Sequence, residues 1–163
     1  MADQLDDVDL ELVRTLQQDA RLSVRALAER LGISRANAYV RFNRLLDRGV
    51  VRGFTVDVDH AALGMQTSAY VEVSMEQNSW RSVRTALAQI PAVQYVCLLG
   101  GAFDALVLIR TYDNHALRNV ILDELQSIDG ITSTRTLLIF EEVDASKAAG
   151  GSPPAIRVHA PVG

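Results

Sequence analysis

The sequence predicts an α+β protein built from two small domains. Three observations lead to this prediction. Apolar residues recur at helical spacing through the first third of the chain, they alternate at strand spacing over residues 67–75, and helical and strand patterns then take turns up to residue 143. A chain of 163 residues is long enough to form two domains, each with a modest core.

The composition excludes several classes of protein. With 48% hydrophobic and 22% charged residues, the chain is typical of a globular protein and not of a disordered one. The acidic N-terminus lacks the features of a signal peptide, and no apolar run approaches the roughly 20 residues that span a bilayer. We therefore expect a cytoplasmic protein without a membrane partner. The net charge of -4 still allows a local basic face.

Residues 1–58 are predicted to form three helices and a short hairpin. Each helix is preceded by a polar residue that can act as its N-cap: Asp6 or Asp7, Ser23 and Ser34. Gly32 and Gly49 follow the second and third helices, where a residue that tolerates positive φ is favoured. The β-branched residues on either side of Arg52 and Gly53 predict a small β-hairpin, or wing, within residues 50–58.

The third predicted helix has one apolar and one basic face. The segment from Ser34 to Arg52 carries a single acid, Asp47, against these arginines: Arg35, Arg41, Arg44, Arg48 and Arg52. The turn before it, Gly32-Ile33-Ser34, has the length that a helix-turn-helix needs, and the second helix of such a motif lies in the major groove of DNA. These features predict a winged helix-turn-helix domain that binds double-stranded DNA. A merely solvated basic face is the alternative interpretation.

The start of the third helix is the part that can reach base edges. Arg35 can pair with guanine and Asn37 with adenine, whereas Arg41, Arg44 and Arg52 are expected to hold phosphates. Phosphate contacts of this kind give affinity but little sequence information. Two further residues complete the predicted DNA-binding set: Ser34 and Ala38.

Beyond a linker at residues 59–66, the segment 67–143 is predicted to form a second domain. The expected strands are residues 67–75, 93–99, 105–109 and 132–140, with helices capped by Ser79 and Asn114. The resulting order, βαββαβ, is that of a ferredoxin-like fold. Two helices cover one face of such a sheet, so a second copy of the chain is the expected cover for the other face. Residues 144–163 are interpreted as a flexible tail.

The pieces LAERLGIS, VRFNRL and RGVVRGF in the first domain, and LLGGAFDALVLIR and GITSTRTLLIFEEV in the second, resemble the Lrp/AsnC family of bacterial and archaeal transcription regulators. The resemblance covers about residues 5–143. It implies a nucleoid-associated regulator that dimerises through its C-terminal domains, often within octamers. It also implies an amino acid or similar small effector, bound between sensing domains.

The resemblance places part of the effector site in one loop: Gly100, Gly101, Ala102, Phe103 and Asp104. The chemistry is reasonable without the family. Backbone N–H groups of a glycine pair can approach a carboxylate, and Asp104 can accept a hydrogen bond from an α-ammonium group. Thr134 and Thr136 alternate onto one face of the last strand and can add hydroxyls. The alternative is a plain hairpin in which Asp104 caps the turn.

Other functions were weighed against this one. A sirohaem decarboxylase-like enzyme shares the two-domain architecture, but it would need basic and histidine side chains around a tetrapyrrole cavity, and few arginines lie in the second domain. A DNA-wrapping nucleoid-architectural protein is a further alternative. His60, His115 and His159 are far apart in sequence and form no metal spacing. We therefore predict a non-enzymatic, sequence-specific transcription regulator without metal or cofactor.

Overall fold

A computed structural model describes residues 5–143 of the chain. Residues 5–56 belong to one compact unit and residues 57–142 to another, and the two are described separately below. The flexible tail expected at residues 144–163 lies outside the described residues.

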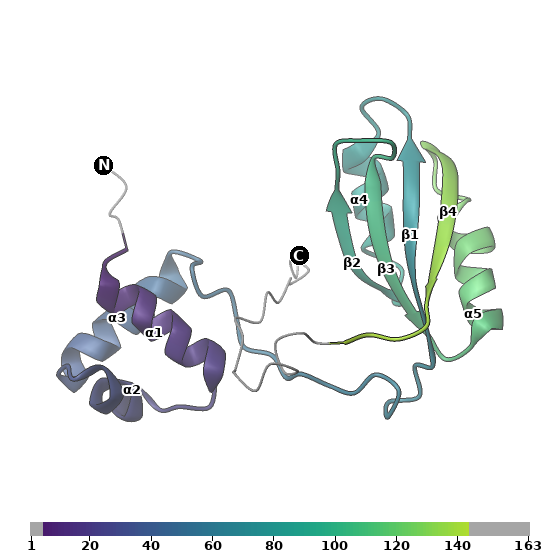
Figure 1. Ribbon diagram of the computed structural model, residues 1–163. Helices are drawn as coiled ribbons and strands as arrows, with labels where there is room; N and C mark the ends of the chain where they lie inside the picture. Colours follow the sequence, from purple (N-terminus) through teal and green to yellow (C-terminus); the bar gives the residue numbers. More distant parts are fainter. Residues whose placement is uncertain (1–4, 144–163) are drawn as a thin grey trace. The chain divides into compact units, whose positions relative to one another are not determined.

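The first unit consists of three helices: α1 (Asp7–Gln18), α2 (Val24–Leu31) and α3 (Arg35–Asp47) (Figure 1). Apolar side chains at helical spacing pack together between them and form a small core made of Leu12, Leu16, Leu27 and Leu45. Burial of these side chains is the main source of stability for a unit of this size. The core therefore fixes which face of α3 points inward and which faces solvent.

The predicted N-caps of the three helices are confirmed. Asp6 forms a capping box with Asp9: its carboxylate accepts from the Asp9 N–H at 2.9 Å, and the Asp9 carboxylate accepts from the Asp6 N–H at 3.3 Å. The hydroxyls of Ser23 and Ser34 each accept a hydrogen bond of 3.2 Å from the backbone N–H three residues later. Gly32 ends α2 in the left-handed conformation, with φ of 63°.

The predicted hairpin at residues 50–58 is wrong. The described chain has no strand between α3 and residue 67, and residues 52–58 are all exposed. Two short strands without a hydrophobic layer beneath them gain too little from pairing to be stable. The β-branched residues of this segment therefore belong to a stretch that forms no strand in the described chain.

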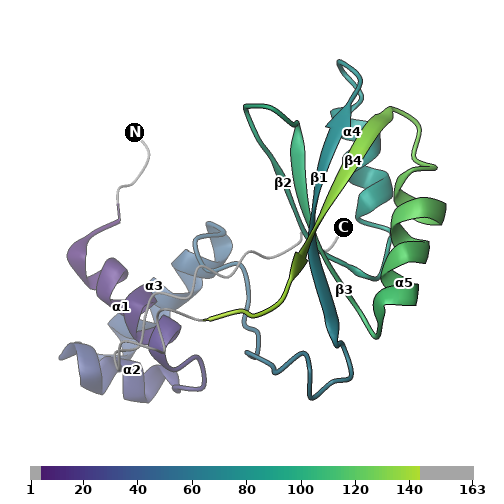
Figure 2. The ribbon, with the colours of Figure 1, turned by 45° about the vertical axis from the view of Figure 1, so that its right-hand side comes forward.

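The second unit is a four-stranded antiparallel sheet made of β1 (Thr67–Met75), β2 (Val93–Leu98), β3 (Ala105–Thr111) and β4 (Ile131–Ile139). The strand order is β2-β3-β1-β4. Helices α4 (Trp80–Leu87) and α5 (Asn114–Asn119) lie on the same side of this sheet (Figure 2). The predicted βαββαβ order and the ferredoxin-like fold are thus confirmed.

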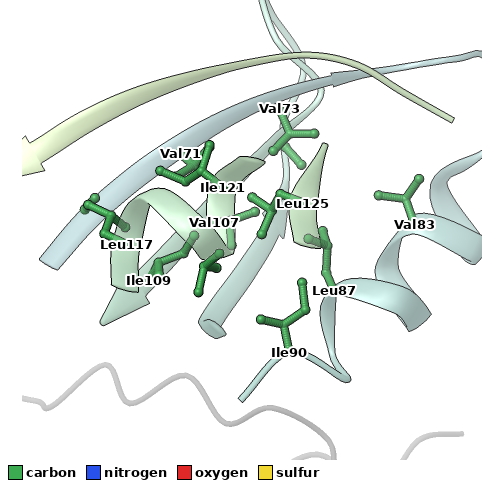
Figure 3. Close-up of a cluster of buried hydrophobic side chains, with 13 residues drawn as sticks. Val71, Val73, Val83, Leu87, Ile90, Val107, Ile109, Leu117, Ile121 and Leu125 are labelled. Atoms are coloured by element: carbon green, nitrogen blue, oxygen red, sulfur yellow. The ribbon is translucent and has the colours of Figure 1, made fainter. Parts of the chain in front are cut away.

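The core of the second unit lies between the sheet and its helices (Figure 3). Alternate residues of β1 and β3 supply one side of it, among them Val71, Val73, Val107 and Ile109, all of which are fully buried. The helices supply the other side with Val83, Leu87, Leu117 and Leu125. The remaining residues of β1 and β3 must therefore point to the opposite face of the sheet.

The second helix of this unit changes its winding part-way along. Helix α5 continues directly into η1 (Val120–Leu125), a π-helical stretch in which the Gln126 N–H donates to the Ile121 carbonyl at 3.0 Å. This wider turn keeps both Ile121 and Leu125 buried against the sheet.

Two of the expected caps in the second unit differ from the prediction. The N-cap of α5 is Asp113, not Asn114, because the Asp113 carboxylate accepts the Ala116 N–H at 2.7 Å. The Asn114 side chain instead accepts a hydrogen bond from the Thr67 hydroxyl. Ser79 stands at the N-cap position of α4 but makes no cap, because its hydroxyl donates to the Glu76 carbonyl at 2.8 Å.

Candidate nucleic-acid interface and effector loop

Helix α3 presents a solvent-exposed face that contains more than its charged residues. Arg35 and Asn37 are exposed at its start. Tyr39 and Val40 are 60% and 63% exposed, although both are large and apolar in part. Neither residue belongs to the DNA-binding set predicted from the sequence. Helical spacing does indicate their exposure, because both lie outside the stripe of buried residues on α3.

The structure corrects one residue of the predicted DNA-binding set. Ala38 is fully buried. Its side chain packs inside the first unit and is not available to a base or a phosphate, because the helical phase set by Leu45 turns it inward. Ser34 is exposed, but its hydroxyl is the cap of α3.

The side chain of Arg41 extends from α3 to the start of α1 and is only 19% exposed. Its Nη1 donates to both carboxylate oxygens of Asp6, each at 2.7 Å, and to Oδ1 of Asp9 at 2.8 Å. Its Nε donates to Oδ1 of Asn37 at 2.9 Å. A side chain that sequence analysis assigned to a phosphate is therefore held by two carboxylates of the same domain.

Arg44 joins the same cluster through a hydrogen bond from its Nη2 to Oδ2 of Asp9. The Asp9 side chain is completely buried, so its charge requires opposite charges nearby, and the two guanidinium groups supply them. The hydrogen bond from Arg41 holds the pKa of Asp6 below its ordinary value, and that of Arg41 is raised by Asp6 and Asp9 in turn. The cluster ties α1 to α3.

Arg35 and Arg52 stand apart from this cluster. Arg35 is exposed at the start of α3, and Arg52 is exposed in the extended segment that follows the helix. Cations at these two places can meet phosphates or base edges without breaking an ion pair among residues 5–143.

The loop between β2 and β3 is anchored at its last residue. The backbone of Asp104 donates to the Val73 carbonyl at 3.0 Å, and its own carbonyl accepts from the Leu99 N–H at 2.8 Å. Its carboxylate accepts from the Met75 N–H at 2.8 Å. The side chain that is predicted to meet an ammonium group thus stabilises the end of β1.

The rest of this loop is open. Gly100, Gly101 and Ala102 are exposed, and Phe103 is half-buried. A Cβ added to either glycine would meet no atom within 4 Å, so crowding inside the chain does not require glycine here. An exposed glycine pair of this kind leaves room for a ligand to approach the backbone, as binding of a carboxylate needs.

Thr134 and Thr136 share the helix-covered side of the sheet. They pair with the buried residues Val73 and Val71, and the Thr134 hydroxyl accepts a hydrogen bond of 3.0 Å from the Gln126 side chain. Thr134 is level with the end of the loop, because Val73 also pairs with Ala105. Thr136 lies two residues further from it. The structure brings Thr134 closer to the loop than Thr136.

The face of the sheet away from the helices is largely apolar. Directly paired residues of neighbouring strands point to the same face of the sheet. The register therefore shows which residues lie on this face. Arg135 forms an ion pair with Glu72 across it, and Arg110, on the same face, forms an ion pair with Glu142. The other large side chains on this face are Tyr70, Tyr95, Cys97, Leu106, Leu108, Leu137 and Ile139.

Residues 5–143 contain neither a helix long and apolar enough to cross a membrane nor a group of at least three side chains suited to hold a metal ion.

Comparison with known proteins identifies both units. A model of winged helix-turn-helix DNA-binding domains matches residues 5–52, and a model of the Lrp/AsnC ligand binding domain matches residues 68–149. The chain belongs to the Lrp/AsnC family. It is 35% identical to the HTH-type transcriptional regulator AldR of Mycolicibacterium smegmatis, over 85% of this chain and 83% of that protein. It is 31% identical to a proline dehydrogenase transcriptional activator of Rhizobium radiobacter, over 86% and 92%.

Solved Lrp/AsnC structures share the fold. The leucine response regulatory protein of Mycobacterium tuberculosis superposes with a TM-score of 0.76 at 29% identity, covering 85% of this chain and 94% of that one. A Neisseria meningitidis transcriptional regulator in complex with L-Met superposes with a TM-score of 0.79 at 24% identity, covering 86% and 93%.

Membership of the Lrp/AsnC family settles the class of function. The chain is a DNA-binding transcriptional regulator, and its curated relatives are regulators and not enzymes. The decarboxylase alternative accordingly has no support among them.

Proposed function

We propose that this chain is a sequence-specific transcription regulator whose assembly or DNA binding is modulated by an amino acid or a similar small effector. The observation that carries the proposal is the combination, in one chain, of an exposed recognition helix with a unit that matches a ligand-binding domain. The site of action is the bacterial or archaeal nucleoid in the cytoplasm, where the DNA target is found.

On the DNA side, helix α3 lies in the major groove. Arg35 and Asn37 meet base edges, and Arg52 holds a phosphate from the segment behind the helix. Tyr39 and Val40 face the groove as well, and the Val40 methyl groups are suited to a thymine methyl. Arg44, which is 35% exposed, adds to the basic field at the edge of the ion cluster.

On the effector side, the open loop 99–104 receives the ligand. Its glycine N–H groups take the carboxylate, and Asp104 takes the ammonium group with the carboxylate oxygen that Met75 does not use. The Thr134 hydroxyl can add a further polar contact to the ligand beside the glycine N–H groups and Asp104, and the Thr136 hydroxyl can add another. Binding alters DNA recognition only if the ligand has different affinities for two assembly states.

The assembly begins with a homodimer formed through the open face of the sheet. Large apolar side chains on this face leave a surface that monomeric proteins rarely expose. A second copy covers it with the same residues, as a two-fold interface requires. Higher assembly, up to an octamer, then links dimers.

Genome-wide mapping of bound DNA, with and without a mixture of amino acids, tests this proposal. We expect short sites upstream of genes whose occupancy changes with the mixture. Long footprints with little sequence preference would instead support an architectural, DNA-wrapping role. An absence of bound sites would contradict the proposal outright.

A further inference from the structure

The hydrogen bond between Arg41 and Asn37 fixes the orientation of an amide on the recognition helix. Every polar hydrogen of arginine is a donor, so the Asn37 atom that faces the Arg41 Nε at 2.9 Å must be the carbonyl oxygen. The NH2 group of Asn37 is then the end that remains for DNA. The assignment of oxygen and nitrogen, which is often ambiguous in asparagine, follows here from the partner.

Arg41 is itself held in place by α1. Its Nη1 lies 2.7 Å from both oxygens of Asp6 and 2.8 Å from Oδ1 of the completely buried Asp9. The Asp9 carboxylate is fixed in turn by the capping box of α1. The path from Asp9 through Arg41 to Asn37 thus joins the capped start of α1 to the start of α3, which carries Asn37.

We propose that Arg41 is a positioning residue for base recognition. It holds the Asn37 oxygen, so that Asn37 presents its NH2 group to the hydrogen-bond acceptors of guanine. Guanine shows two adjacent acceptors, N7 and O6, in the major groove, whereas adenine shows one acceptor beside a donor. Asn37 in this network is therefore selective for guanine instead of the adenine that a free asparagine prefers. The inference rests on the proposed function, since it names how the same helix selects its site.

Selection of binding sites from randomised DNA with the full-length protein tests this. The key variant is Arg41→Lys, which keeps the charge but cannot reach the carboxylates and Asn37 with one planar fork. Asp6→Asn is a second variant that keeps an N-cap while it removes one anchor. Arg14→Lys, at an exposed ion pair with Glu11 on α1, is the matched control. Thermal unfolding establishes that each variant is folded.

We expect wild type to prefer guanine over adenine by about tenfold at one base pair of each half-site, and Asn37→Ala to lose this preference. Arg41→Lys should reduce it to below about threefold, with the salt dependence of binding unchanged, and Asp6→Asn should act in the same direction. Arg41→Lys combined with Asn37→Ala should select the same motif as Asn37→Ala alone, because Arg41 acts through Asn37. Substitution of 7-deazaguanine at that position should weaken wild-type binding only.

Three results would overturn the inference while leaving the proposed function intact. They are an unchanged motif for Arg41→Lys, an adenine at the position that Asn37→Ala relaxes, and a salt slope that falls by about one for Arg41→Ala, which would make Arg41 a phosphate contact. A wild-type protein that enriches no motif at all would contradict the proposed function together with the inference.

Discussion

The carboxylate of Asp104 accepts a hydrogen bond of 2.8 Å from the backbone N–H of Met75, at the point where the pairing of β1 with β4 shifts its register. One residue thus serves both the sheet and the candidate effector loop. Removal of this side chain leaves a half-buried donor without its partner, so a substitution at Asp104 tests two roles at once. The two roles can be separated by the choice of replacement.

Asp104→Asn should lose amino-acid binding at least about tenfold while the protein stays folded, because asparagine keeps an acceptor for Met75 but has no charge for an ammonium group. Asp104→Ala should lose the binding and also about 1–3 kcal/mol of unfolding free energy. Calorimetry against the twenty amino acids and urea unfolding measure the two effects. Wild-type affinity in the Asn variant would exclude Asp104 from ammonium binding.

Arg52→Ala should weaken binding to all DNA sequences alike. Loss of one phosphate contact is expected to lower the slope of log affinity against log salt by about 0.9 without a change of motif. Arg14→Ala, which removes an exposed arginine of α1, is the control and should leave the slope unchanged. An equal change of this slope in both variants would mean that Arg52 contributes only to the net charge of the domain and does not contact a phosphate.

Leu137→Asp should convert the protein to monomers. Leu137 lies on the open face of the sheet opposite Tyr70 and is 44% exposed in the single chain, so the aspartate costs little within one copy. Burial of that charge between two copies is strongly unfavourable. Light scattering gives the mass of the assembly. A dimer of unchanged affinity would place the interface elsewhere.

Gly130→Ala should destabilise the second unit by about 2–4 kcal/mol, because two costs coincide there. Gly130 has a φ of 91°, and an added Cβ would lie 2.6 Å from the Cβ of Ser79. Gly32→Ala is the matched control with positive φ and open space, and should cost only about 1 kcal/mol. Urea unfolding compares them. Equal losses would mean that the contact with Ser79 is easily relieved.

Acid should remove the stabilisation that Asp6 gives to the first unit. The pKa of Asp6 is lowered in the folded protein, mainly by its hydrogen bond from Arg41, so the stabilisation is complete above the ordinary value of 3.8 and is lost as the pH falls below it. The stability difference between wild type and Asp6→Asn should therefore close in that range. Unfolding curves at a series of pH values measure it, and a gap that persists at low pH would contradict the assignment.

Many features that depend on a few neighbouring residues could be predicted from the sequence, although the Ser79 cap and the hairpin at residues 50–58 were not among them. A serine hydroxyl reaches the N–H three residues on, and alternate residues of a strand share a face, so Ser23, Ser34 and the four strands were identified correctly. The N-cap of α5 was placed one residue too late, at Asn114 instead of Asp113, for a local reason. Asparagine and aspartate are both good N-caps, and only the backbone angles decide which of two adjacent residues takes the position.

Contacts between distant residues could not be predicted. Helical spacing shows that Arg41 lies on a polar face, but its partners Asp6 and Asp9 precede it by more than thirty residues and meet it only after α1 packs on α3. The burial of Ala38, in contrast, follows from helical spacing alone, because Ala38 shares the inner face of the helix with Leu45, and its assignment to DNA overlooked this. A basic residue on a recognition helix can thus bind DNA or form ion pairs within its own domain, and the number of arginines does not distinguish these two roles.

The π-helical winding of η1 has a consequence for changes in the length of this chain. A hydrogen bond that spans five residues encloses one residue more than an α-helical turn needs. The deletion of one exposed residue, such as Asp123, would let this turn close as ordinary α-helix while Leu117 and Leu125 still reach the sheet. The extra residue of the π-helical turn is therefore a position at which this chain is expected to tolerate a one-residue deletion without a shift of the following strand.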